Sequence, residues 1–164
     1  MLFRSTSNGA VRMYNYLGTE WVQMGSTIEG GGTNYLLGNA VELNKHGNNV
    51  IIGVYCFRAS DSACNGRAQV YEWNGSNWNQ KGNTLSDNIY QTYFGVDVSI
   101  SNDGNIVAVS GTYNSNIVYV YEWNGSSWSQ LGDTIIRNGQ QFKIGNYISL
   151  NGNGTMISKI GRAH

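Results

Sequence analysis

The sequence is short of charge, and this shortage excludes two classes of partner. Charged residues make up 12% of the 164 residues, proline is absent, and ten basic residues balance ten acidic ones to a formal net charge of zero. A nucleic-acid-binding protein needs a basic face that releases counterions from phosphate, and binding to an anionic membrane needs basic residues as well. We therefore expect neither nucleic acid nor a membrane as a partner.

Long apolar runs are missing too. No segment approaches the roughly 18 apolar residues of a membrane span, and residues 1–6 are too polar for the apolar stretch of about 7–15 residues in a signal peptide. The chain could still derive from a secreted precursor. Aromatic residues (12%) and many β-branched residues argue against disorder and favour strands, and no helical pattern is visible. The length suits a single all-β domain.

The sequence does contain an internal repeat. The segment YEWNGSNWNQ at 71–80 returns as YEWNGSSWSQ at 121–130 and, eroded, as YNYLGTEWVQ at 14–23. Its second tryptophan recurs at intervals of 57 and then 50 residues, and three sets of glycines keep the same spacing. These anchors are Trp21, Trp78 and Trp128; Gly25, Gly82 and Gly132; Gly38, Gly95 and Gly145; and Gly47, Gly104 and Gly154. The difference in length falls between Gly53 and Val70, which marks a surface loop.

Each repeat predicts four strands, which we name A, B, C and D. Strand A is predicted at 39–44, 96–101 and 146–151, strand B at 50–54, 106–110 and 156–160, strand C at 11–16, 68–73 and 118–123, and strand D at 20–24, 77–81 and 127–131. Asn-Gly at 74–75 and 124–125 predicts two-residue type I′ turns between C and D. Such turns place three aromatic pairs face to face: Tyr71 with Trp78, Tyr121 with Trp128, and Tyr14 with Trp21.

A four-stranded unit of about 40–50 residues is typical of a β-propeller blade. The order of strands predicts a half blade at 11–28, blades at 38–85 and 95–135, and a half blade at 145–160. Because propeller rings hold about four to eight blades, three should not close alone. We expect a homodimer that forms a six-bladed ring, in which the first CD hairpin of one chain completes the last AB hairpin of the other. The alternative is a piece of a longer array.

Residues 94–109 and 120–125 resemble integrin-like FG-GAP β-propeller repeats, in the form found in large microbial and environmental proteins. The likeness covers nearly the whole chain and implies an extracellular or cell-surface binding or adhesion module. Many such repeats hold calcium in an aspartate-rich loop after the first strand. The matching loops here contain one carboxylate, Asp103, and calcium takes about six to eight oxygen ligands. We therefore predict no structural calcium and no cofactor.

Candidate contact residues lie where the copies differ. The B–C and D–A connections share one end of the repeats, and variable loops on a regular scaffold are where binding usually occurs. Tyr35, Tyr90, Tyr93 and Phe142 are candidate ligand contacts there, with ordinary loop packing as the alternative. Asp97, which replaces Ala40 and Tyr147 of the other copies, is a fifth candidate and is expected to face a central channel with Ser99.

The remaining reactive residues predict little chemistry. Cys56 and Cys64 both lie in the inserted loop and would pair in an oxidising compartment, or stay reduced otherwise. His46 and His164 have no recognisable nucleophile or carboxylate partner, so we predict no catalytic residue and no metal site. The favoured function is a non-enzymatic module that binds carbohydrate or protein. The alternatives are a glycan-acting propeller hydrolase or lyase, and a purely structural segment of a larger surface protein.

Overall fold

A computed structural model describes residues 9–30, 35–56, 66–87, 93–111, 117–136 and 147–160, without the side chains of residues 35, 36, 55, 56, 159 and 160. Every regular element in these ranges is a β-strand, and every strand pair is antiparallel, which confirms the all-β prediction. In this part of the chain no helix is long and apolar enough to cross a membrane.

Two sheets contain four strands each in the predicted order, and the second sheet has β13 as a fifth strand. The first sheet consists of β5 (Tyr35–Leu43), β6 (Asn49–Cys56), β7 (Arg67–Trp73) and β8 (Trp78–Gln80), paired in chain order. The second consists of β9 (Val98–Ile100), β10 (Ile106–Gly111), β11 (Ile117–Trp123) and β12 (Trp128–Gln130), paired in the same way. These are strands A to D of two successive repeats.

The flanking units show fewer strands in the described residues. In residues 9–30 the N-terminal unit has strands C and D, with the elements β1 (Ala10–Val11), β2 (Tyr14–Tyr16), β3 (Trp21–Gln23) and β4 (Ile28–Glu29). The C-terminal hairpin has strands A and B alone, β14 (Tyr147–Leu150) and β15 (Ile157–Ile160), within the described residues.

A short segment after strand D returns to the start of strand C in each copy. This segment was not predicted. It pairs as β4 with β1, as Leu85 with Ala68, and as β13 (Ile135–Ile136) with β11.

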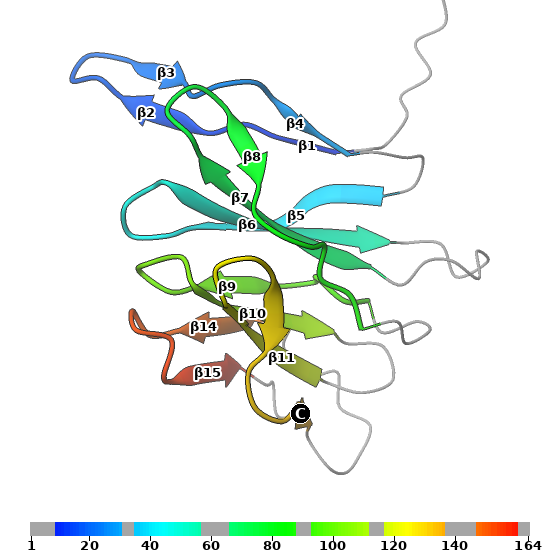
Figure 1. Cartoon of the computed structure of the whole chain (residues 1–164). Coiled ribbons are helices and arrows are strands. Elements are labelled where there is room, and N and C mark those ends of the chain that lie inside the picture. The colour runs from blue at the N-terminus through cyan, green and yellow to red at the C-terminus, as the bar shows by residue number, and fades with distance from the viewer. Residues whose placement is uncertain are drawn as a thin grey trace, which may run out of the picture.

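The four units pack face to face in chain order (Figure 1). Strand β6 shows how the alternation of side chains fills both interfaces. Val50 and Ile52 pack against Val11 and Met13 of the N-terminal unit, whereas Ile51 belongs to the core shared with the second sheet. A third cluster joins the second sheet to the C-terminal hairpin, so each sheet is apolar on both faces and lies between neighbours.

The predicted pairing of the C–D hairpins is wrong. Each strand-D tryptophan pairs with the strand-C residue two positions nearer the turn than predicted: Trp78 with Trp73, Trp128 with Trp123 and Trp21 with Tyr16. The ring centroids of these pairs are 5.4, 5.4 and 5.3 Å apart. Four residues rather than two therefore form each turn.

The side chain of Asn74 explains the longer turn. A type I′ turn needs positive φ at both central residues, but of this pair only Gly75 has it, with φ of 98°. Asn74 Oδ1 instead accepts hydrogen bonds from the backbone N–H groups of Ser76 and Asn77, at 2.9 and 2.8 Å. Asn124 acts in the same way in the second sheet. The asparagine is thus used as a side-chain acceptor and not for a left-handed backbone.

Replacing Asn74 by glycine distinguishes the two turns. In a type I′ turn Asn74→Gly would be tolerated, but here it removes the acceptor for two N–H groups, so we expect a loss of about 1 kcal/mol in the free energy of unfolding. Urea unfolding measures the change. Asn74→Asp, which keeps the acceptor, is the control, and an Asn74→Gly variant as stable as the unaltered chain would contradict the assignment.

Candidate functional site

Polar side chains on the A strands bond to the backbone of the next sheet. Each bond runs from a backbone N–H group to a side-chain oxygen of the preceding A strand. The donors and acceptors are Ile100 to Glu42 Oε2 (3.1 Å), Ile148 to Asp97 Oδ2 (2.6 Å) and Leu150 to Ser99 Oγ (3.0 Å). Glu42 and Ser99 occupy matching positions 57 residues apart, so one contact recurs at two interfaces.

The two carboxylates of this group, Glu42 and Asp97, are half-buried, and burial raises both pKa values. For Glu42 the loss of water raises the pKa, hydrogen bonds from the Ser99 side chain and the Ile100 backbone lower it, and the charge of Asp97 raises it. For Asp97 desolvation again dominates over the hydrogen bond from Ile148. Both acids hold neighbouring sheets together, and the sequence analysis singled out Asp97 but missed Glu42.

The raised pKa of Asp97 predicts the direction of a pH effect. Between the ordinary pKa of 3.8 and the raised native value, the folded chain keeps a proton that the unfolded chain has lost. This contribution to stability is complete below pH 3.8 and is lost as the pH rises through the native pKa. In Asp97→Asn the amide oxygen still accepts from Ile148 but does not titrate, so we expect a smaller fall in unfolding free energy with rising pH.

Urea unfolding at a series of pH values from about 3 to 8 measures this dependence. Asp97→Ala separates the hydrogen bond from the charge, because it should be destabilised by about 1–3 kcal/mol at every pH in this series. An Asp97→Asn variant with the pH dependence of the unaltered chain would show that the carboxylate does not titrate as described.

Lys81 is a buried cation that the sequence analysis missed. Its ammonium group donates to three oxygen atoms, Gly104 O (3.0 Å), Asn105 Oδ1 (3.1 Å) and Asn49 Oδ1 (3.4 Å). Burial lowers the pKa of Lys81, and the charges of Glu72 and Asp103 oppose this. The sequence did hold a signal for its burial, because Lys81 stands at a position where the other two copies have the apolar residues Met24 and Leu131. Three donated hydrogen bonds give it a structural role between the two sheets.

The A–B turn that resembles a calcium loop is closed on itself. Asp103 accepts hydrogen bonds from the Ser101 hydroxyl at 2.6 Å and from the backbone and side-chain nitrogens of Asn105 at 3.1 and 3.2 Å. The bond from Ser101 is the largest cause of the lowered pKa of Asp103. Among the described residues no three His, Cys, Asp or Glu side chains gather as a metal site would require.

Of the predicted ligand contacts, Tyr93 and Asp97 are described in full. Tyr93 has φ of 50°, and it is the one non-glycine residue of the described ranges with positive φ. Its counterpart in the first sheet, Leu36, lies in the regular strand β5 and pairs with Tyr55. The repeat therefore does not require this conformation. The next residue, Phe94, is fully buried against Tyr119 and Tyr121.

The other predicted residues lie outside this description. Tyr90, Phe142, Cys64 and His164 fall in ranges that are not described. Tyr35 and Cys56 are described by backbone alone, at the start of β5 and the end of β6. The ligand contacts predicted at Tyr35, Tyr90 and Phe142 and the Cys56–Cys64 disulfide therefore stay predictions.

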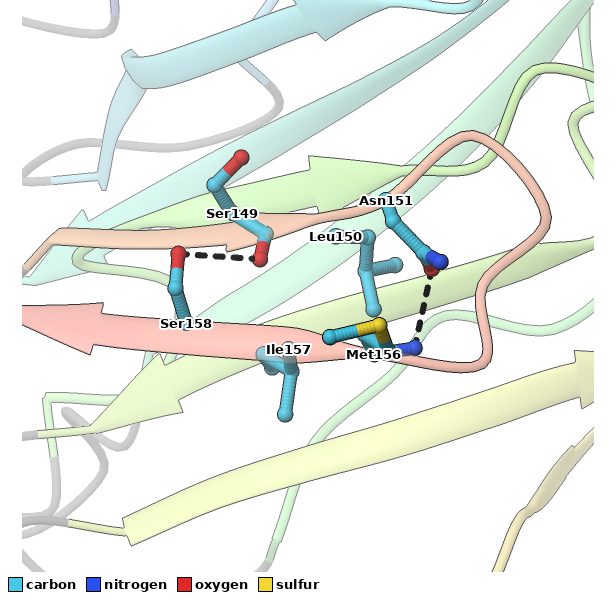
Figure 2. Close-up of a pocket in the computed structure, with 6 residues that line it drawn as sticks. All are labelled: Ser149, Leu150, Asn151, Met156, Ile157 and Ser158. Atoms are coloured by element: carbon cyan, nitrogen blue, oxygen red, sulfur yellow. Dashed lines mark hydrogen bonds between the residues drawn. The ribbon is translucent and has the colours of Figure 1, made fainter.

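A hollow of about 270 Å³ lies on the C-terminal hairpin (Figure 2). It is lined by Ser149, Leu150, Asn151, Met156, Ile157 and Ser158, none of which titrates. Met156 is 70% exposed, whereas the matching residue of the first sheet, Asn49, is 2% exposed. The hollow is therefore on a surface that is covered in the first sheet.

Comparison with protein-family models and with curated protein sequences finds no match to this chain.

Proposed function

We propose that the chain is a non-enzymatic binding module of the β-propeller type, with its ligand site at the end where the B–C and D–A connections meet. Three observations support the propeller arrangement. Successive sheets share the strand order A to D, they pack face to face, and their A strands are joined by the hydrogen bonds of Glu42, Asp97 and Ser99. The described acids of the A strands, Glu42 and Asp97, thus accept hydrogen bonds that join neighbouring sheets.

The described strand ends that flank the variable segments lie at one end of the sheets. Strands β5, β7, β11 and β14 begin there and strands β6 and β10 end there, because neighbours are antiparallel. These strand ends flank five segments whose sequences differ: 31–34, 57–65, 88–92, 112–116 and 137–146. The turns at the opposite end repeat Asn-Gly and Gly motifs. Constant scaffold with variable connections is the usual arrangement of a binding surface.

The left-handed backbone of Tyr93 is the observation that carries the proposal. A non-glycine residue in this region costs of order 1 kcal/mol, and such strain concentrates at functional sites. The matching position of the first sheet does without it. Tyr93 stands at the start of the A region of the second sheet, beside the variable connections. An aromatic ring offers a flat stacking surface, and the chain as a whole has a formal net charge of zero, so we propose an uncharged ligand, carbohydrate, as the first ligand class.

The variant Tyr93→Gly tests this assignment. Glycine adopts positive φ freely, so the backbone at this position tolerates the substitution, and we expect a folded chain that has lost ligand binding. A glycan array with the unaltered chain identifies the ligand, and titration of that glycan measures the loss, expected to be at least about tenfold. Leu17→Ser, at the opposite end of the sheets, is the control and should bind normally.

Two results would contradict the proposal. If Tyr93→Gly bound the glycan as tightly as the unaltered chain, Tyr93 would have no part in the site. If no glycan on the array bound the unaltered chain, carbohydrate would be excluded as the ligand class, and a protein ligand would then need to be sought at this end.

A further inference from the structure

A tryptophan on strand D of each sheet is hydrogen-bonded to the preceding unit. Trp78 Nε1 donates to the carbonyl oxygen of Met24 at 3.0 Å, and Trp128 Nε1 donates to that of Lys81 at 2.7 Å. The two side chains are 8% and 5% exposed. Trp21, at the same position of the N-terminal unit, is 67% exposed. One tryptophan of the series therefore lacks the neighbour that covers the other two.

Each of the two buried C–D hairpins packs its strand-C tryptophan against a glycine of the preceding unit. A Cβ atom on Gly25 would stand 2.8 Å from the ring of Trp73, and one on Gly82 would overlap the ring of Trp123. Gly132 has the same left-handed backbone, with φ of 71°, but apart from its two chain neighbours no atom of the described residues lies within 4 Å of where its Cβ would be. The C-terminal end of the second sheet thus carries a receiving surface of the same design that is open.

The two incomplete units show matching open edges. Strands β6 and β10 each pair with a C strand, whereas β15 pairs with β14 alone and β2 with β3 alone in the described residues. The A strand of the first sheet is open in the same way. Val41 and Leu43 are each 45% exposed, whereas their counterparts Val98 and Ile100, which the first sheet covers, are 4% and 6% exposed.

We propose that these surfaces bind a second copy of the chain, head to tail. The β14–β15 hairpin of one copy lies beside β2 of the other, covers its Val41 and Leu43, and completes a four-stranded sheet. The register of β6 with β7 places Ile157 opposite Tyr14. The same placement brings Trp21 to the carbonyl oxygen of Leu131 and sets the ring of Tyr16 on Gly132.

The contacts within the chain argue for a second copy and not for an unrelated partner. The two halves of the missing interface, a CD hairpin and an AB hairpin, both belong to this chain and lie at opposite ends of the stack (Figure 1). A single placement of the second copy gives the Trp21 N–H group an acceptor and fills the space above Gly132. The same placement pairs the open strand edges and covers Val41 and Leu43. This surface is separate from the proposed ligand site, so the inference goes beyond that function.

The first experiment is sedimentation of the unaltered chain and of Trp21→Ser over a range of concentrations. We expect the unaltered chain to associate to at least twice its mass of 18.0 kDa. Because a buried interface tryptophan often dominates binding, Trp21→Ser should weaken association at least about 30-fold. Its unfolding temperature in dilute solution should fall only slightly, since the ring is 67% exposed there and loses its contact with Tyr16.

Leu17→Ser is the matched control for this variant. Leu17 is 61% exposed at the tip of the same hairpin, and its counterparts Asn74 and Asn124 stay exposed at the tips of the buried hairpins. The control should therefore associate as the unaltered chain does. Equal weakening by Leu17→Ser and Trp21→Ser would show non-specific apolar association and would overturn the proposal.

A mixing experiment tests the head-to-tail geometry. Ser158→Arg blocks the other half of the interface, because Ser158 is exposed while its counterparts Ile51 and Ala108 are fully buried. Trp21→Ser alone and Ser158→Arg alone should be monomeric. Their mixture should form a heterodimer, because one of its two interfaces joins an unaltered head to an unaltered tail.

Three outcomes would overturn the proposal. The first is an unaltered chain that is monomeric at the highest concentration it tolerates, and the second is a Trp21→Ser chain that associates normally. The third is a mixture of the two blocked variants that stays monomeric although the unaltered chain associates.

Discussion

The seam between neighbouring units depends on the strand-D tryptophan. Its ring covers apolar surface while its single N–H group reaches a backbone carbonyl of the preceding unit, and a glycine makes room for the aromatic partner beside it. A buried indole needs such an acceptor, because an unpaired N–H group would cost of order 1–3 kcal/mol. Equivalent tryptophan and glycine residues form the interface before the first sheet and the interface before the second. The spacing of these residues along the chain therefore sets how each sheet packs on the preceding unit.

Polar bonds between the A strands add direction to this packing. Glu42, Asp97 and Ser99 each accept a backbone N–H from the next sheet. Apolar faces alone would let sheets slide, whereas a hydrogen bond to one particular N–H group holds the register. Burial disfavours the ionised form of the two acids, and this raises the pKa of Glu42 and of Asp97. Lys81 provides a comparable link between the end of β8 and the A–B turn of the second sheet.

Much of the fold could be predicted from the sequence because it repeats. The spacing of Trp21, Trp78 and Trp128 located the units, and alternation within each unit located strands A to D. The C–D turn was mispredicted, because Asn-Gly suits both a two-residue turn and a longer turn in which the asparagine side chain accepts the hydrogen bonds. Local sequence does not separate these two uses of asparagine.

The candidate site was less predictable for a related reason. Tyr93, Asp97 and Lys81 are the places where one copy departs from the others, and a departure shows that something differs without showing what it contacts. The most direct test of the seam is hydrogen exchange of the indole N–H groups, followed by NMR in dilute solution. The account predicts slow exchange for Trp78 and Trp128 and fast exchange for Trp21. Exchange of Trp78 or Trp128 as fast as that of Trp21 would contradict it.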